Sequence, residues 1–227
     1  LSVLSLAVHA DAAELRGNIT TAEGNVNIQD NAADGVATLL NDVVVSTGDG
    51  AGDVTFGDLE GQNDLTIDAG TGSIILNGGD IGALTIQDAT VATDAGATEV
   101  TFNGLFNSNG AMSIDATTID VNGGAAGSSV TFDATAIQLA GSVAAENGNV
   151  DMTAAFTIDG DSVVSSENTN VIFTGAVVDG IAGDGAGLEV NAPSGTVTFT
   201  STIGADGDDN RLNDVRVNAN ELILNDN

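Results

Sequence analysis

The sequence predicts an all-β chain that folds as a parallel β-solenoid of about ten coils. Three observations lead to this prediction. Apolar and polar residues alternate with a period of two over many short runs, such as Val54 to Phe56 and Leu65 to Ile67, which is typical of β-strands. Asn-Gly and Asp-Gly pairs, which favour tight turns, separate these runs. Two apolar motifs recur about every 21 residues along the chain, a length that suits one coil of two or three short strands.

The first strand is expected over residues 1–10, LSVLSLAVHA. Alternation points His9 toward solvent, and toward the core the residues Leu4, Leu6, Val8 and Ala10. The alternative is the end of a secretory signal peptide, since the run is apolar and closes on small residues, but no basic segment precedes it. No other run approaches the roughly 20 apolar residues that a membrane helix requires. Membrane insertion is therefore not expected.

Further strands begin at the recurring motifs. The first motif places a glycine two residues before an apolar-x-apolar triplet, and these triplets begin at Val26, Ile74, Met112, Val150 and Val197. The second motif is Val-x-Phe and begins at Val54, Val100, Val130 and Val171. Equivalent residues of successive coils should stack in columns, with Val54 and Phe56 pointing inward and Thr55 outward. A buried column of rings would then contain Phe56, Phe102, Phe132, Phe173 and Phe199.

A β-sandwich is the competing fold, because a local strand spacing of 9 to 11 residues also suits two packed antiparallel sheets. The interleaved motifs, the Asn-rich corners and the absence of Trp and Tyr favour the solenoid, whose narrow core has little room for large rings with polar ends. Residues 1–227 are interpreted as a single solenoid domain, or as a section of a longer repeat array.

The composition excludes several classes of function. The formal net charge is −30, from 33 acidic residues and only three basic ones. Nucleic acids and anionic membranes are therefore not expected as partners, since both attract Lys and Arg. The chain has no Cys, and hence no disulfide or thiol chemistry, and its single His9 offers no catalytic triad. We expect no enzymatic activity.

Residues 57–79, GDLEGQNDLTIDAGTGSIILNGG, and residues 188–224 resemble the filamentous-haemagglutinin type of bacterial exoprotein and other cell-surface proteins with β-strand repeats. The resemblance implies a right-handed β-helix, export from the cell, and an adhesive or matrix role. The Asn-Pro-Asn motifs of the secretion domain in such proteins are absent, and Pro193 is the only proline. The chain would therefore belong to the shaft.

Calcium is the one cofactor that the sequence suggests, because aspartate-rich turns supply the hard oxygen ligands that it prefers. The candidate ligands lie in two turns and are Asp49, Asp53, Asp206, Asp208 and Asp209. The alternative is that both turns are simply solvated.

End-to-end assembly is predicted from the two ends of the sequence, LSVLSLAV and ELILNDN, which both read as strands without polar caps. Terminal coils of a solenoid leave backbone N–H and C=O groups unpaired. The expected junction contains the apolar residues Leu4, Leu6, Val8, Val217, Leu222 and Leu224, with Arg211 and Arg216 offsetting the acidic repulsion. Residues 6–10 also align with residues 215–219, which suggests that the last coil resembles the first.

These observations together predict a non-enzymatic structural protein located outside the cell or on its surface. Its partner would be itself, in a head-to-tail homopolymer that forms the shaft of a surface fibre or matrix. The alternative is a cell-surface adhesin or carbohydrate-binding β-helix module, whose partner would be an extracellular polysaccharide.

Overall fold

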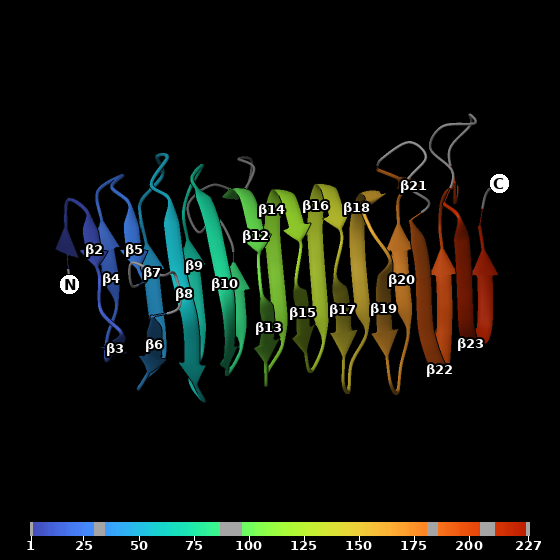
Figure 1. Cartoon of the computed structure of the whole chain (residues 1–227), viewed down its shortest axis with the longest axis horizontal. Coiled ribbons are helices and arrows are strands. Elements are labelled where there is room, and N and C mark those ends of the chain that lie inside the picture. The colour runs from blue at the N-terminus through green and yellow to red at the C-terminus, as the bar shows by residue number, and fades with distance from the viewer. Residues whose placement is uncertain (1, 30–34, 87–96, 181–185, 205–211, 226–227) are drawn as a thin grey trace.

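The computed structural model describes residues 2–29, 35–86, 97–180, 186–204 and 212–225. These residues contain 23 β-strands and no helix, and they form a right-handed parallel β-solenoid of about 9 turns. The turns stack into an elongated body along which the chain runs from one end to the other (Figure 1). All the strand pairings between described residues are parallel, which confirms the predicted solenoid and excludes the antiparallel sandwich.

Each turn contributes three strand segments, and each segment pairs with the equivalent segments of the neighbouring turns. We call the three sides of the coil faces A, B and C, in the order in which the chain visits them. Face A contains β1 (Ser2–Val3), β4 (Ile19–Thr21), β7 (Val43–Ser46), β9 (Leu65–Asp68), β11 (Leu84–Ile86), the first parts of β14 (Met112–Val121), β16 (Val130–Leu139) and β18 (Val150–Ile158), then β20 (Val171–Thr174) and the last parts of β22 (Gly187–Phe199) and β23 (Asp214–Leu224). Face B contains β2 (Leu6–Val8), β5 (Val26–Ile28), the first parts of β8 (Val54–Gly61) and β10 (Ser73–Ile81), β12 (Ala97–Phe102), the second parts of β14, β16 and β18, and β21 (Val177–Asp179). Face C contains β3 (Ala12–Leu15), β6 (Val36–Leu39), the second parts of β8 and β10, β13 (Leu105–Ser108), β15 (Gly124–Gly127), β17 (Ser142–Ala145), β19 (Ser162–Ser166) and the first parts of β22 and β23.

The two sequence motifs occupy two different faces, so the interpretation of one motif per coil is wrong. The motif strands that begin at Val26, Val54, Ile74 and Val100 pair with one another on face B. Those that begin at Met112, Val130, Val150, Val171 and Val197 pair on face A. The short interval of 12 residues from Val100 to Met112 therefore crosses only from face B past face C to the next face A.

The turns also differ in length. Along face A, 28 residues separate Ile86 from its partner Ile114, but only 18 separate Ile114 from Phe132. Strand segments keep their register because the additional residues are accommodated between strands. A period measured from sequence alone is therefore an average over unequal turns.

The core is a continuous stack of apolar side chains inside the coil. All seven Phe side chains are at most 1% exposed, and Val54 and Phe56 point inward as predicted, while Thr55 is only half-buried. The rings form no single column, because Phe56 and Phe102 lie on face B whereas Phe132, Phe173 and Phe199 lie on face A. The rings nevertheless meet in the interior, where Phe173 stacks on Phe199 with 4.8 Å between ring centroids.

Asparagine and aspartate side chains at the corner before face A bond to the backbone of the next turn. The Asp64 carboxylate accepts a hydrogen bond from the N–H of Ala83 at 2.8 Å. Asn149 accepts one from the N–H of Asn170 at 3.2 Å, and Asn170 in turn accepts one from that of Thr196 at 2.9 Å. Each side chain supplies an acceptor at a bend in the backbone, where the strand ladder is interrupted.

The glycines of the Asn-Gly pairs serve close approach between turns, and positive φ is not their role. Among described residues, positive φ is confined to Glu23 and to five glycines that follow neither Asn nor Asp. A Cβ at Gly104 would come within 2.0 Å of the Asn77 carbonyl oxygen, and one at Gly123 within 2.4 Å of the Gly104 carbonyl carbon. Any side chain at these corners would force neighbouring turns apart.

Candidate assembly interface

The N-terminal end of the solenoid is formed by β1, β2 and β3. Leu6 and Val8 on β2, and Ala13 on β3, pack against the core but remain half-buried, because only the following turn covers them. Leu4 does not point inward as predicted. It is 81% exposed, because the chain turns a corner between β1 and β2 at this residue and the alternation restarts after it.

The C-terminal end is formed largely by β23. Leu222 and Leu224 pair in register with the buried residues Val197 and Phe199, so they occupy inward positions, yet they are 48% and 52% exposed. Val217 pairs with the buried Val190 and is half-buried. These three predicted interface residues therefore continue core columns to the end of the described stack.

Partly buried apolar side chains that pack against the core gather at the two ends. Seven of these eight side chains belong to the first and last described turns, and Ala134 is the exception. The seven are Leu6, Val8, Ala13, Ile203, Leu212, Val217 and Ala219. Each end of the described stack thus presents a cross-section of the core.

The predicted alignment of residues 6–10 with residues 215–219 is wrong. Leu6 and Val8 lie on face B, whereas Val215 and Val217 lie on face C. The inward column of face C that begins at Ala13 is the one that reaches Val217. The sequence match reflects only the alternation that all three faces share.

Basic side chains are confined to the terminal turns in the part of the chain that the structure describes. Arg16 forms an ion pair with Glu14 at 2.7 Å in the first turn, and Arg216 forms one with Asp214 at 2.7 Å in the last. Arg211 lies outside the described residues. The described turns between the ends carry acidic residues but no Lys or Arg, so electrostatic repulsion between two copies is smallest where their ends meet.

The two predicted calcium turns are only partly described. Asp53 accepts a hydrogen bond from the N–H of Ser73 at 3.0 Å and one from the Asn25 side chain at 3.4 Å, so its carboxylate bridges turns at a corner. Asp49 is exposed in the segment between β7 and β8. The other candidates, Asp206, Asp208 and Asp209, lie outside the described residues. Among the described residues, no three His, Cys, Asp or Glu side chains are grouped to hold a metal ion.

One acidic cluster was not predicted from the sequence. Glu99 on β12 and Asp120 on β14 come together because their strands pair on adjacent turns of face B, and Asp159 follows the next strand but one. Burial, a side-chain hydrogen bond with Glu99, and repulsion by Glu99 and Asp159 raise the pKa of Asp120 from 3.8 to about 6. The three carboxylates are distant in sequence and belong to no motif, so only the pairing of the turns could reveal them.

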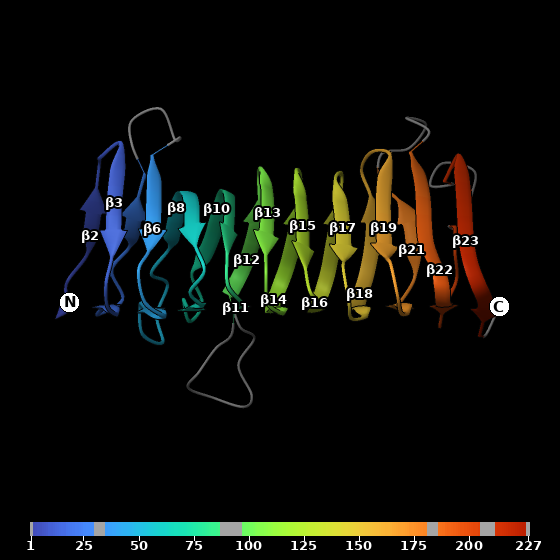
Figure 2. The same cartoon turned by 90° about the horizontal axis from the view of Figure 1, so that it is seen from below.

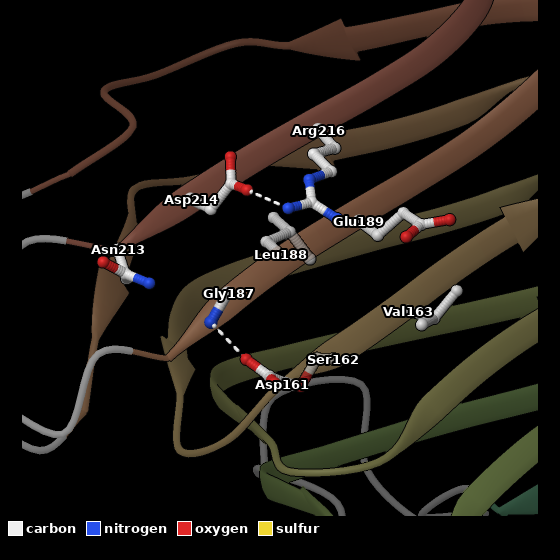
Figure 3. Close-up of a pocket in the computed structure, with 9 residues that line it drawn as sticks. All are labelled: Asp161, Ser162, Val163, Gly187, Leu188, Glu189, Asn213, Asp214 and Arg216. Carbon is white, nitrogen blue, oxygen red and sulfur yellow. Dashed lines mark hydrogen bonds and ion pairs between the residues drawn. The ribbon is translucent and has the colours of Figure 1, made fainter.

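A cavity of about 250 Å³ lies on face C near the C-terminal end, between β19, β22 and β23 (Figure 3). At its edge, the Asp161 carboxylate accepts a hydrogen bond from the N–H of Gly187 at 3.0 Å. The Arg216–Asp214 ion pair and Glu189 also line it. A second cavity, of about 230 Å³, lies at the corner between faces C and A, where the Asn109 side chain donates a hydrogen bond to Asp80 at 2.8 Å.

Comparison with known proteins assigns no family to the chain. A scan against protein-family models gives no match, and neither curated proteins nor solved structures match it. Within the described ranges, no helix is long and apolar enough to cross a membrane.

Proposed function

We propose that the chain is a non-enzymatic, extracellular structural protein that forms the shaft of a surface fibre or matrix by end-to-end stacking of its turns. The supporting observation is that the core columns continue to both ends of the described stack and remain half-covered there. Terminal strands also present unpaired N–H and C=O groups to which another strand can add.

The register of the junction follows from the three faces. On face C, Ala13 of one copy continues the column that ends at Val217 of the other. On face B, Leu6 continues the column that ends at Ile203. This contact joins two different surfaces and does not close on itself, so it generates a filament.

The apolar contribution to this junction is large enough to matter. Covering the exposed halves of Leu222 and Leu224 removes about 90 Å² from water at each side chain, which stabilises the contact by roughly 2 kcal/mol apiece. Backbone pairing along three strand edges and the other columns add to this. The ion pairs at Arg16 and Arg216 offset carboxylates at both ends, which lowers the electrostatic cost of approach.

Composition supports a place outside the cell. The resemblance to exoproteins implies export, and the strongly acidic surface favours solubility of a long assembly. An adhesin that binds an extracellular polysaccharide is the second candidate, and the cavity in Figure 3 favours it. The carboxylates, Asn213 and Arg216 that line this cavity can exchange hydrogen bonds with sugar hydroxyls.

Electron microscopy of the concentrated protein tests the assembly. We expect filaments with an axial repeat near 45 Å, since the structure has about 9 turns at ~4.8 Å each. Val217→Lys places a charge in the junction and should abolish them, whereas Asn218→Lys, at the neighbouring exposed position, should not. A wild-type protein that remains monomeric, or filaments that survive Val217→Lys, would contradict the proposal.

A further inference from the structure

An uncharged surface lies in the middle of face C. The four consecutive strands β13, β15, β17 and β19 contain no charged residue, although the whole chain carries a formal net charge of −30. These strands stand side by side along the solenoid (Figure 2), and we call their outward side the neutral face. Two copies can approach through the neutral face without placing carboxylates against one another.

The relief of the neutral face suits contact with another protein surface. Leu105 and Val163 lie at its two ends and are 57% and 39% exposed, which sets them among the few large apolar side chains exposed on described turns away from the ends. Gly124 and Ser142 lie between them in the same outward column, so the centre is shallow. Large apolar side chains flanking small ones allow two such faces to pack closely.

The charges that flank the neutral face differ in sign on its two sides. Toward the N-terminal end, the same outward column continues through Gly78 to Asp58 on β8. Toward the C-terminal end, it continues through Glu189 to Arg216 on β23. Counted from the boundary between β15 and β17, Asp58 and Arg216 each lie in the fourth strand outward.

We propose that the neutral face binds a second copy of this chain, with the two solenoid axes antiparallel. A two-fold axis between β15 and β17 superimposes β13 of one copy on β19 of the other, and it brings Arg216 opposite the partner's Asp58 twice. A parallel arrangement would instead set Asp58 against Asp58 and Arg216 against Arg216. Charge complementarity therefore selects the antiparallel contact.

The extent of this contact predicts a weak pairing. Eight strands at ~4.8 Å spacing span about 38 Å, and a strip about 14 Å wide then buries roughly 1,000 Å² in total, at the lower limit for a specific interface. Isolated molecules should consequently dimerise weakly. In a filament the same contact recurs with every subunit, and multivalency would turn it into lateral bundling.

The test uses a background in which end-to-end stacking is blocked, Leu222→Lys on face A, so that the lateral contact is measured alone by sedimentation equilibrium. We expect a reversible dimer whose dissociation constant rises at least tenfold with Ala144→Glu, at the centre of the neutral face. Ala136→Glu, at an outward position of face B, is the matched control and should leave dimerisation unchanged. Circular dichroism establishes that each variant is folded.

A charge exchange tests the antiparallel orientation. Asp58→Arg and Arg216→Asp should each weaken the dimer, and the double variant should restore it. A monomer at all concentrations in the stacking-blocked background, equal effects of the two glutamates, or a double variant as weak as the singles would overturn the inference. Filaments of the wild-type protein would still form in that case, which separates this inference from the proposed function.

Discussion

Replacing Phe173 with Ala tests the register of the core most directly. Phe173 on β20 is fully buried, stacks on Phe199 with ring centroids 4.8 Å apart, and meets the edge of Phe156 at 5.2 Å. Its removal opens a cavity between rings that belong to three successive turns. The backbone ladder holds these turns at fixed spacing, so the cavity cannot readily collapse.

The expected loss of stability is about 4–6 kcal/mol. Truncation of a buried Phe to Ala typically costs about 3–5 kcal/mol, and the two ring contacts contribute roughly 0.5–1.5 kcal/mol each, part of which the first figure already includes. Thr174→Ala, at the next and exposed position of β20, is the matched control and should change stability by less than ~0.5 kcal/mol.

Urea unfolding followed by far-ultraviolet circular dichroism measures both variants, since the chain has no Trp for fluorescence. Comparable losses for Phe173→Ala and Thr174→Ala would show that β20 does not point Phe173 inward. A loss below about 1 kcal/mol for Phe173→Ala would refute the claim that neighbouring turns hold the cavity open.

Three further predictions concern polar groups. Because folding raises the pKa of Asp120 to about 6, its native form binds a proton more tightly than its unfolded form, and its contribution to stability falls as pH rises from about 4 to about 6. Asp120→Asn should therefore stabilise the protein at pH 7, by at most about 1 kcal/mol given solvent screening, and not at pH 4, as measured by urea unfolding at both values; a gain of equal size at pH 4 would contradict it. Asn170→Ala removes the acceptor for the Thr196 N–H and should cost about 1 kcal/mol in the same assay, whereas Asn220→Ala, at an exposed position of β23, should cost little. If calcium binds at the aspartate-rich turns, the melting temperature should rise more with calcium than with sodium at equal ionic strength, and Asp49→Asn should reduce the difference; equal effects of the two ions would leave only screening.

Local features of the solenoid could be predicted from the sequence because they depend on near neighbours along the chain. Alternation in runs such as Val54 to Phe56 distinguishes inward from outward side chains wherever a strand is straight. It also placed Leu6 and Val8 at the N-terminal end, and Val217, Leu222 and Leu224 at the C-terminal end, on the side that faces the core. For Leu4 it failed, because a corner interrupts the strand there.

Only the tertiary structure decided on which face each strand lies. That assignment depends on how many residues every preceding corner accommodates, and the step from Ile86 to Ile114 exceeds the next by ten residues without any change in alternation. The Glu99–Asp120 pair and the neutral face both arise from strands brought together across turns. Their physical cause is the pairing of backbones one turn apart, about 4.8 Å in space but roughly twenty residues along the chain, which a pattern with a period of two cannot encode.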